Sequence, residues 1–187
     1  VLLAMKLFSG QLVPGVRQSV EDMLVQTANL LAEAAAGEAA SGKLEAHRIG
    51  ALFQAYRQRQ FEAHIYGVVK NDPDLRVYLT DARGIVVFDS LGVATGENYS
   101  RWLDVSRTLK GGYGARTTLE NPYDPSSVVM YVAAPVRIGG TIAGVLSVGK
   151  PARSFQTFID LAKAETRRAA LGLFGLAMLI ALAFSWW

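Results

Sequence analysis

The last part of the chain is an uncharged, apolar stretch that is long enough to cross a lipid bilayer. From Ala169 to Trp187 no residue is charged, and Ser185 is the only one with a hydroxyl group. As a helix rising about 1.5 Å per residue, it would extend over roughly 28 Å, close to the hydrocarbon thickness of a membrane. Two arginines precede the stretch and two tryptophans end it, and membrane interfaces favour both residue types. We therefore expect residues 167–187 to form a transmembrane helix, with a buried core helix as the alternative.

The first eight residues, VLLAMKLF, are apolar apart from Lys6 but too short to span a membrane. They carry no charged leader and no small-residue cleavage site, so they do not form a complete signal peptide. We expect residues 1–8 to be the end of a first transmembrane helix, with a short buried strand or the start of a helix as the alternative. Residues 9–166 would then be one folded domain between two membrane helices.

The composition narrows the function classes. Hydrophobic residues make up 51% of the chain and charged residues 19%, which excludes an intrinsically disordered chain. Cysteine is absent, so disulfides, thiolate nucleophiles and zinc–cysteine sites are excluded. The 19 basic residues are scattered among 16 acidic ones, and nucleic-acid binding usually needs a clustered basic stripe. We expect no nucleic-acid partner.

Catalytic and cofactor motifs are absent from the sequence. His47 and His64 have no partner at helical metal-ligand spacing, so we expect no metal site. The glycines around Tyr113 lack the Lys-Ser/Thr of a phosphate-binding loop, and no serine nucleophile elbow or kinase signature occurs. We therefore expect no catalytic residue and no cofactor in this chain.

Residues 14–36 have the periodicity of a helix. Pro14 is expected in its first turn and Gly37 just past its end. Apolar residues at spacings of three and four predict a seam of about three heptads. This seam can pack on its own domain or on the same helix of a second chain. Its residues are Val16, Val20, Met23, Thr27, Leu30 and Ala34, with Leu24 and Leu31 beside them.

The rest of the chain has the pattern of a helix followed by strands. A linker over 38–43 leads to a second helix over 44–59. Runs of β-branched and aromatic residues between turn signals predict five strands, which we expect to form an antiparallel meander. An exit helix from Ser154 continues into the membrane segment. Helices followed by grouped strands predict an α+β fold. The expected strands are 76–80, 85–89, 114–119, 128–136 and 142–149.

Several runs resemble the extracytoplasmic sensor of CreC-type histidine kinases. The similarity extends over nearly the whole chain, including the Trp-Trp end, and the run Tyr-Ser-Arg-Trp with the later Tyr-Val-Ala-Ala-Pro is its most specific part. A strand such as Gly-Val-Leu-Ser-Val-Gly is shared widely among PDC (Cache) sensors. The runs that carry the resemblance are 14–17, 78–81, 99–105, 112–119, 130–135 and 144–151.

The resemblance implies a PAS-like PDC (Cache) sensor with a long N-terminal helix, a five-stranded antiparallel sheet and a C-terminal transmembrane helix. It further implies a homodimer in the bacterial inner membrane, with the sensor domain in the periplasm. Such sensors report to a cytoplasmic kinase region of the same protein and to a response regulator in a two-component system. Their signal is a small molecule, and because small acids are common ligands of related sensors, we expect a carboxylate.

In PDC sensors the ligand pocket lies on the sheet face that the loop between the second and third strands covers. Alternation puts Arg116 and Thr118 on one face of their strand, and Tyr131 on one face of the next. A guanidinium within a strand pairs, snorkels or binds an anion, and its fork suits a carboxylate. The expected ligand-binding residues are Arg101, Trp102, Tyr113, Arg116, Thr118, Tyr131, Ser147 and Lys150.

Alternatives remain at this point. Arg116 or Arg101 can form a structural ion pair with Asp104 or Asp89, with Trp102 in the core. The domain can also be a protein-interaction module in which Arg101, Trp102 and Tyr123 form a docking surface, because these residue types are frequent at interfaces. A chemoreceptor-type ligand-binding domain with a different cytoplasmic output is a third hypothesis.

Overall fold

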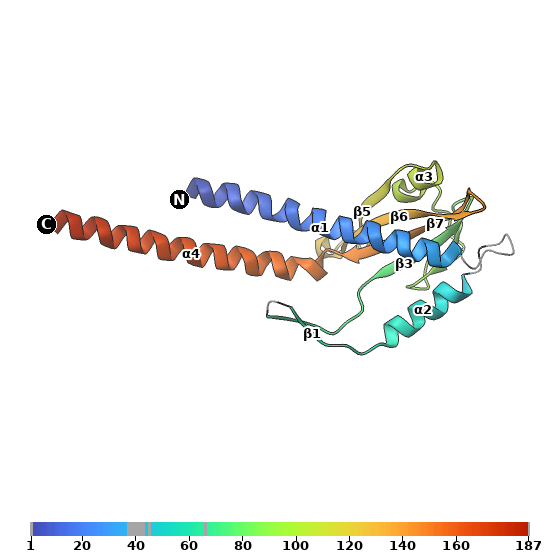
Figure 1. Cartoon of the computed structure of the whole chain (residues 1–187), viewed down its shortest axis with the longest axis horizontal. Helices are drawn as coiled ribbons and strands as arrows, with labels where there is room; N and C mark the ends of the chain where they lie inside the picture. The colour runs from blue at the N-terminus through green and yellow to red at the C-terminus, as the bar shows by residue number, and fades with distance from the viewer. Residues whose placement is uncertain (1, 37–43, 45, 66, 187) are drawn as a thin grey trace. The chain divides into compact units, whose positions relative to one another are not determined.

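The computed structural model describes residues 2–36, 44, 46–65 and 67–186, with residues 2–13 as backbone (Figure 1). The chain divides into two compact units. One comprises Val1–Ser19 and Phe155–Trp187, and the other is Val20–Ser154. The first unit holds the beginning of helix α1 (Leu2–Ala36) and nearly all of helix α4 (Arg153–Trp186). The second holds the sheet and the shorter helices.

Helix α4 is a candidate membrane span by its length and composition. Its most apolar part has a mean hydropathy of 2.1 and is not buried. An unburied apolar stretch does not fit the alternative of a core helix. The exit helix and the apolar stretch are one continuous helix, as expected. The assignment of residues 1–8 to a membrane helix stays a prediction, since their side chains lie outside those that are described.

Helix α1 begins earlier than the sequence predicted. It starts at Leu2, so Pro14 lies inside it rather than in its first turn. The predicted start at Pro14 was wrong because it relied on the preference of proline for the first turn of a helix. In α1, Pro14 lies in the helix interior, where it cannot donate a backbone hydrogen bond. The end at Ala36 agrees with the prediction. The expected stop at Gly37 and the linker over 38–43 fall outside the described residues.

The sheet is antiparallel and contains five strands in the order β4-β3-β7-β6-β5. The expected meander is therefore wrong, because the last strand lies in the middle of the sheet. Residues 145 to 148 of β7 are all fully buried, which is typical of a central strand covered on both faces. The strands are β3 (Arg76–Asp81), β4 (Val86–Asp89), β5 (Gly114–Leu119), β6 (Val128–Ile138) and β7 (Thr141–Pro151).

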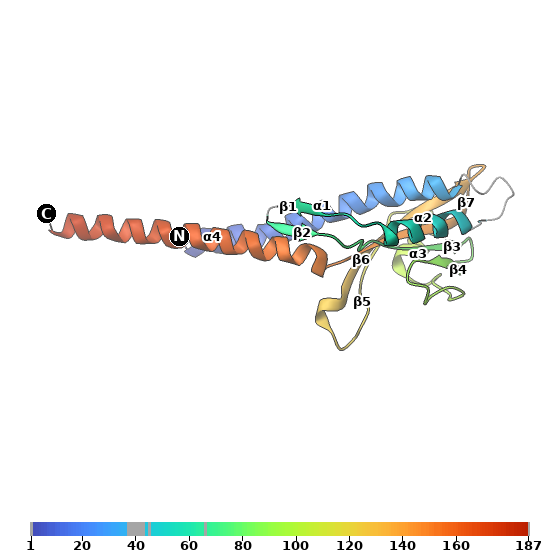
Figure 2. The ribbon, with the colours of Figure 1, turned by 90° about the horizontal axis from the view of Figure 1, so that it is seen from below.

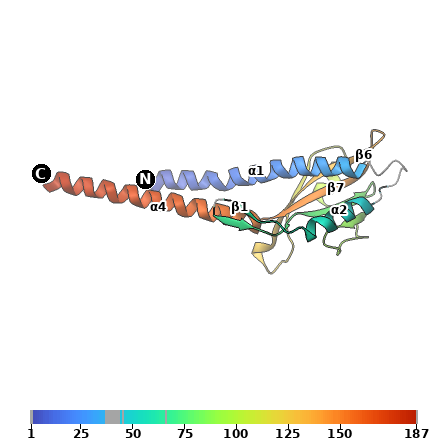
Figure 3. The same cartoon turned by 60° about the horizontal axis from the view of Figure 1, so that its bottom comes forward.

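Two further elements lie between α1 and the sheet in the sequence. Helix α2 (His47–Gln58) falls within the predicted second helix. A hairpin of β1 (Ala63–Ile65) and β2 (Val68–Lys70) was not predicted, because strands of three residues carry too little alternation to be recognised. Figure 3 shows this hairpin lying apart from the five-stranded sheet.

Each face of the sheet has its own hydrophobic cluster. Helices α1 and α2 cover one face, where Leu24, Ile49 and Phe53 pack against Leu79 and Leu146. The other face lies under the β4–β5 connection, which contains the short helix α3 (Leu103–Leu109). The β5–β6 connection, with the 3-10 helix η2 (Pro125–Ser127), projects from the sheet (Figure 2).

The face that α1 turns towards the sheet is offset from the predicted seam. Its buried residues are Leu24, Ala28, Ala32 and Ala35, and three of the four are alanine. Small side chains let the helix approach the sheet closely. Two predicted seam residues, Met23 and Leu30, are 41% and 73% exposed, so packing on its own domain does not account for them.

Asp74, in the loop before β3, ties the β1–β2 hairpin to the end of β7. Its carboxylate lies 2.8 Å from Lys70 Nζ and accepts a hydrogen bond of 3.0 Å from Lys150 Nζ. Burial alone would raise the pKa of Asp74, but hydrogen bonds from Lys70, Ser154 and Lys150 outweigh it and lower the pKa to about 2. The ionised carboxylate therefore stabilises the folded state.

We predict that Asp74→Asn lowers the free energy of unfolding at pH 7 by about 1–2 kcal/mol. The folded-state pKa of Asp74 is below the ordinary value of 3.8, so the wild-type protein should lose this contribution to its free energy of unfolding as the pH falls from about 4 towards 2. Urea unfolding of wild type and Asp74→Asn at pH 7 and pH 3 measures the effect of the substitution and the effect of pH. Asp72→Asn, at an exposed neighbour, is the control. An unchanged free energy for Asp74→Asn would contradict the prediction.

Candidate functional site

Helix α3 lies close against the sheet because residue 114 has no side chain. A Cβ atom at Gly114 would lie 2.1 Å from the carbonyl oxygen of Asp104 and 2.3 Å from Thr108 Oγ1. The start of β5 therefore passes directly under α3. This packing holds Asp104, in the first turn of α3, over the middle of the sheet.

Asp104 is fully buried and has three side-chain partners from three different strands. Tyr78 of β3 donates a short hydrogen bond from its hydroxyl to Oδ2. Ser147 of β7 donates to the same oxygen at 3.0 Å, and Arg116 Nε of β5 donates to Oδ1 at 3.0 Å. A buried carboxylate is stable only when it is paired and hydrogen-bonded, and these partners meet that need.

The guanidinium of Arg116 lies between two aromatic rings. Its Cζ atom is 3.8 Å from the ring centroid of Trp102 and 4.6 Å from that of Tyr131. Both distances fall within the range of cation–π attraction. The side chain is only 12% exposed, and Nη2 is buried without a hydrogen-bond partner among the described residues. One donor of the fork is thus available to bind an acceptor.

Two more tyrosines complete an aromatic cluster around this ion pair. Tyr99 stacks on Trp102 with ring centroids 3.8 Å apart, and its ring meets that of Tyr78 edge-on with centroids 5.2 Å apart.

Two tyrosines of the cluster have raised pKa values. Burial raises the pKa of Tyr131 to about 12. Burial and the negative charge of Asp104 raise the pKa of Tyr78 well above its usual value. Both phenols stay protonated at neutral pH and act as hydrogen-bond donors.

A second ion pair lies at the edge of the cluster. Arg76 at the start of β3 pairs with Glu120, just after β5. The Tyr131 hydroxyl donates to the same Glu120 oxygen at 3.2 Å. Glycine at position 149 leaves room for the Tyr131 ring, because a Cβ atom there would lie 2.3 Å from it. Tyr131 is therefore held at both its ring and its hydroxyl.

Four of the eight predicted ligand residues meet at this place: Trp102, Arg116, Tyr131 and Ser147. The ion pair between Arg116 and Asp104, which the sequence left open as a structural alternative, is present. Sequence reasoning did not assign Tyr78 and Tyr99 to the site. Alternation along β3 signals that Tyr78 faces away from Val77 and Leu79, but no local signal places Tyr99 against Trp102.

The other four predicted residues lie elsewhere. Arg101 is exposed, and Thr118 is half-buried on the same strand face as Arg116. Tyr113 is 52% exposed and donates a hydrogen bond to Glu21 of α1. Lys150 pairs with Asp74, because it is three residues from Ser147 in β7 and so faces the opposite side. The structure does not bring Tyr113 and Lys150 together with Arg116, and their role in ligand binding stays a prediction.

Known proteins show what the sequence of this chain is similar to. No family model matches the chain. It is 44% identical over 181 residues to Sensor protein CreC of Escherichia coli (strain K12), an alignment that covers 97% of this chain. The chain is a relative of CreC. It spans 38% of the length of that CreC protein, so it corresponds to a part of it.

Solved structures confirm that this CreC relative has the fold of PDC (Cache) sensors. The sensor domain of the V. cholerae histidine kinase DctB matches with a TM-score of 0.51 and 14% identity, covering 79% of this chain and 54% of that one. The ligand-binding domain of the Campylobacter jejuni chemoreceptor Tlp3, in complex with 4-methylisoleucine, matches with a TM-score of 0.54 and 16% identity, covering 82% of this chain and 58% of that one. The predicted α+β sensor fold is therefore confirmed.

We predict that Arg116→Met lowers the free energy of unfolding by about 3 kcal/mol, because it leaves the Asp104 carboxylate buried without its cation. Methionine keeps an apolar side chain next to the two aromatic rings. The lost free energy of unfolding therefore measures the effect of removing the positive charge. Urea unfolding of the chain in detergent micelles measures it. Arg107→Met, at an exposed position of α3, should change the stability little. A loss below about 1 kcal/mol for Arg116→Met would mean that the pair is not needed for folding.

Proposed function

We propose that the chain is the signal-sensing part of a membrane-bound sensor histidine kinase in a two-component system. The observation that carries this proposal is the 44% identity to CreC over 97% of the chain. The kinase region would lie in the part of the protein that this chain does not span, and a response regulator would receive its signal. In this proposal residues 9–166 lie in the periplasm and residues 167–187 cross the inner membrane.

The signal would bind at the cluster around Arg116 and Asp104. The support is the unpaired Nη2 donor of Arg116, which suits a carboxylate oxygen. Trp102 lies over the guanidinium and is itself stacked by Tyr99. A ligand would therefore reach Nη2 by displacing Trp102. Tlp3 has been solved with valine and isoleucine bound, and both carry a carboxylate.

Strand β7 offers a short route from this cluster to the membrane helix. Ser147 donates to Asp104, and β7 ends at Pro151, just before α4 begins at Arg153. A ligand that binds one arrangement of Asp104 and Trp102 more tightly than another would shift β7 and so the start of α4. Only such a difference in affinity can drive the change.

A thermal-shift screen of the chain in detergent micelles with acetate, succinate, L-valine and L-isoleucine tests the ligand site. A true ligand at about 100 times its Kd should add about 2.7 kcal/mol of stability. We expect at least one of these acids to raise Tm for wild type and Arg107→Met, but not for Arg116→Met. No shift with any acid, or an equal shift in Arg116→Met, would rule out this site for small acids.

A second candidate function is a protein-interaction sensor without a small-molecule ligand. The observation that favours it is that the guanidinium of Arg116 already fills the space between Trp102 and Tyr131. Two residues of types frequent at interfaces are exposed, Arg101 in the β4–β5 connection and Tyr123, at 94%, in the β5–β6 connection. A negative result in the ligand screen would favour this function. The identity to CreC favours a kinase output over the output of a chemoreceptor.

We further propose that the sensor works as a homodimer through α1. The support is the exposed apolar pair Met23 and Leu30 on the helix that leads to the first membrane segment. Leu30→Glu should convert the dimer to a monomer in size-exclusion chromatography with light scattering, because it places a charge in an apolar seam. Leu52→Glu, at another exposed apolar position, in α2, should leave the dimer intact. A wild-type monomer, or an unaffected Leu30→Glu dimer, would contradict the proposal.

A further inference from the structure

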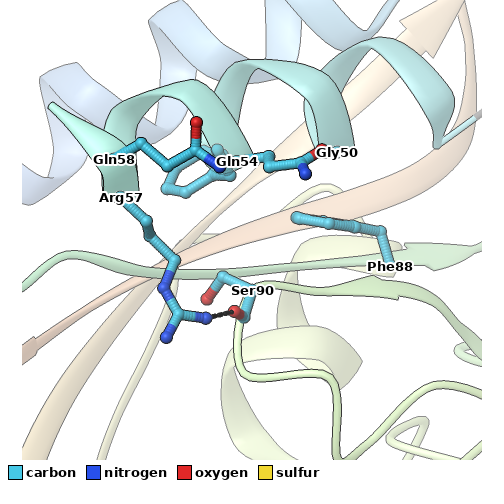
Figure 4. A pocket seen from close by; sticks show the side chains of 7 residues that line it. Gly50, Gln54, Arg57, Gln58, Phe88 and Ser90 are labelled. Carbon is cyan, nitrogen blue, oxygen red and sulfur yellow. Dashed lines mark hydrogen bonds between the residues drawn. The ribbon is translucent and has the colours of Figure 1, made fainter.

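A cleft of about 340 Å³ opens between α2 and β4, and neither the resemblance nor the proposed function assigns it a role. Its walls come from five residues of α2 and two at the end of β4 (Figure 4). Pockets for small ligands commonly have volumes of about 300–1,000 Å³, so the cleft has room for a small molecule. The lining residues are Gly50, Phe53, Gln54, Arg57, Gln58, Phe88 and Ser90.

The cleft belongs to the α2 side of the sheet. Phe53 is in the hydrophobic cluster that α1 and α2 form with the sheet, and Phe88 packs against that cluster. The Arg116 cluster lies with Tyr78 and Tyr131 under α3, on the other face. The two places share no residue, so binding in the cleft does not depend on the proposed signal site.

Two phenylalanine rings form the apolar part of the cleft. The ring centroids of Phe53 and Phe88 are 6.1 Å apart and tilted by 49°. Residue 50 is glycine, and a Cβ atom there would already touch the Phe88 ring at 3.5 Å. The space over Phe88 therefore exists because α2 has no side chain at this position. Rings arranged in this way suit a flat apolar group.

The three polar side chains that α2 contributes to the cleft are exposed, and each carries hydrogen-bond donors. Arg57 Nη1 donates to the carbonyl oxygen of Ser90 at 2.8 Å, and Figure 4 shows the side chain reaching across to it. This bond uses one N–H of the guanidinium and fixes its position. The structure gives the rest of the guanidinium, and the amides of Gln54 and Gln58, no hydrogen-bond partner among the described residues. An acceptor in the cleft can therefore meet several donors together.

The charge around the cleft favours an anion. The lining contains Arg57 and no carboxylate. A planar guanidinium next to amide donors suits a carboxylate, which can accept two parallel hydrogen bonds.

We propose that the cleft between α2 and β4 binds a small carboxylate with an aromatic ring, its ring over Phe53 and Phe88 and its carboxylate on Arg57. Each part of the ligand is matched by a separate group of the cleft. The site is distinct from the cluster around Arg116. A molecule bound here would bridge α2 to the edge strand of the sheet.

Phenylacetate is the probe, because it joins one ring to one carboxylate. Its affinity for the chain in detergent micelles is measured by ligand-observed NMR titration. We expect saturable binding that Arg57→Gln weakens by about tenfold or more, since the charge-assisted bonds are lost. Gly50→Leu should abolish binding by filling the space over Phe88. Phenylacetamide, which has the same ring without the charge, should bind about tenfold more weakly than phenylacetate.

Two control variants distinguish binding in this cleft from binding at another arginine. Arg59→Gln removes a nearby charge outside the lining and should change the affinity less than about twofold, because such charges are screened. Arg107→Met, at an exposed position of α3, should leave phenylacetate binding unchanged. Circular dichroism shows whether each variant is folded. The proposal is overturned by no saturable binding, by equal binding of phenylacetamide, or by folded Arg57→Gln and Gly50→Leu variants that bind like wild type. Loss of binding in a folded Arg116→Met variant alone would place the carboxylate under α3 instead.

Discussion

The carboxylate of Asp104 is removed from solvent at the centre of the domain, and the elements around it are arranged so that this charge is paired. Arg116 supplies the cation, and Tyr78 and Ser147 supply the hydroxyl donors. These three residues come from β5, β3 and β7, so one side chain of α3 joins three of the five strands. A buried charge that loses such partners is strongly destabilising, which makes the position of α3 and the order of the strands interdependent.

The same arrangement supports the proposal that the guanidinium of Arg116 receives the ligand. Arg116 is held by Asp104 at one nitrogen and by two aromatic rings at its faces, while another nitrogen has no acceptor among the described residues. Holding the cation in this way reduces the entropy that a ligand must otherwise remove on binding. The cleft under α2 uses Arg57 in a comparable way, fixed by Ser90 and otherwise open. Arg116 and Arg57 are thus two anchored arginines that lie on opposite faces of the sheet.

Local patterns in the sequence were sufficient for most of the elements. All five strands of the main sheet were expected close to their observed positions, and β5 was expected at its observed bounds. Alternation also assigned Arg116 and Tyr131 to their faces. It did not place β7 between β3 and β6, because strand order depends on contacts between residues distant in sequence. The grouping of Lys150 with Ser147 failed because it relied on proximity in the strand, whereas a spacing of three residues puts them on opposite faces.

The sequence by itself determined most of the elements, the apolar helix at the C-terminal end and the similarity to CreC, because all three depend on local composition and residue identity. Only the tertiary structure decided which side chains share a site. Arg116 had several candidate partners in the sequence, and the close passage of β5 under α3, possible because residue 114 is glycine, selected Asp104. The cleft at Arg57 was likewise invisible in the sequence, because its two walls are α2 and the end of β4, and only folding brings them together.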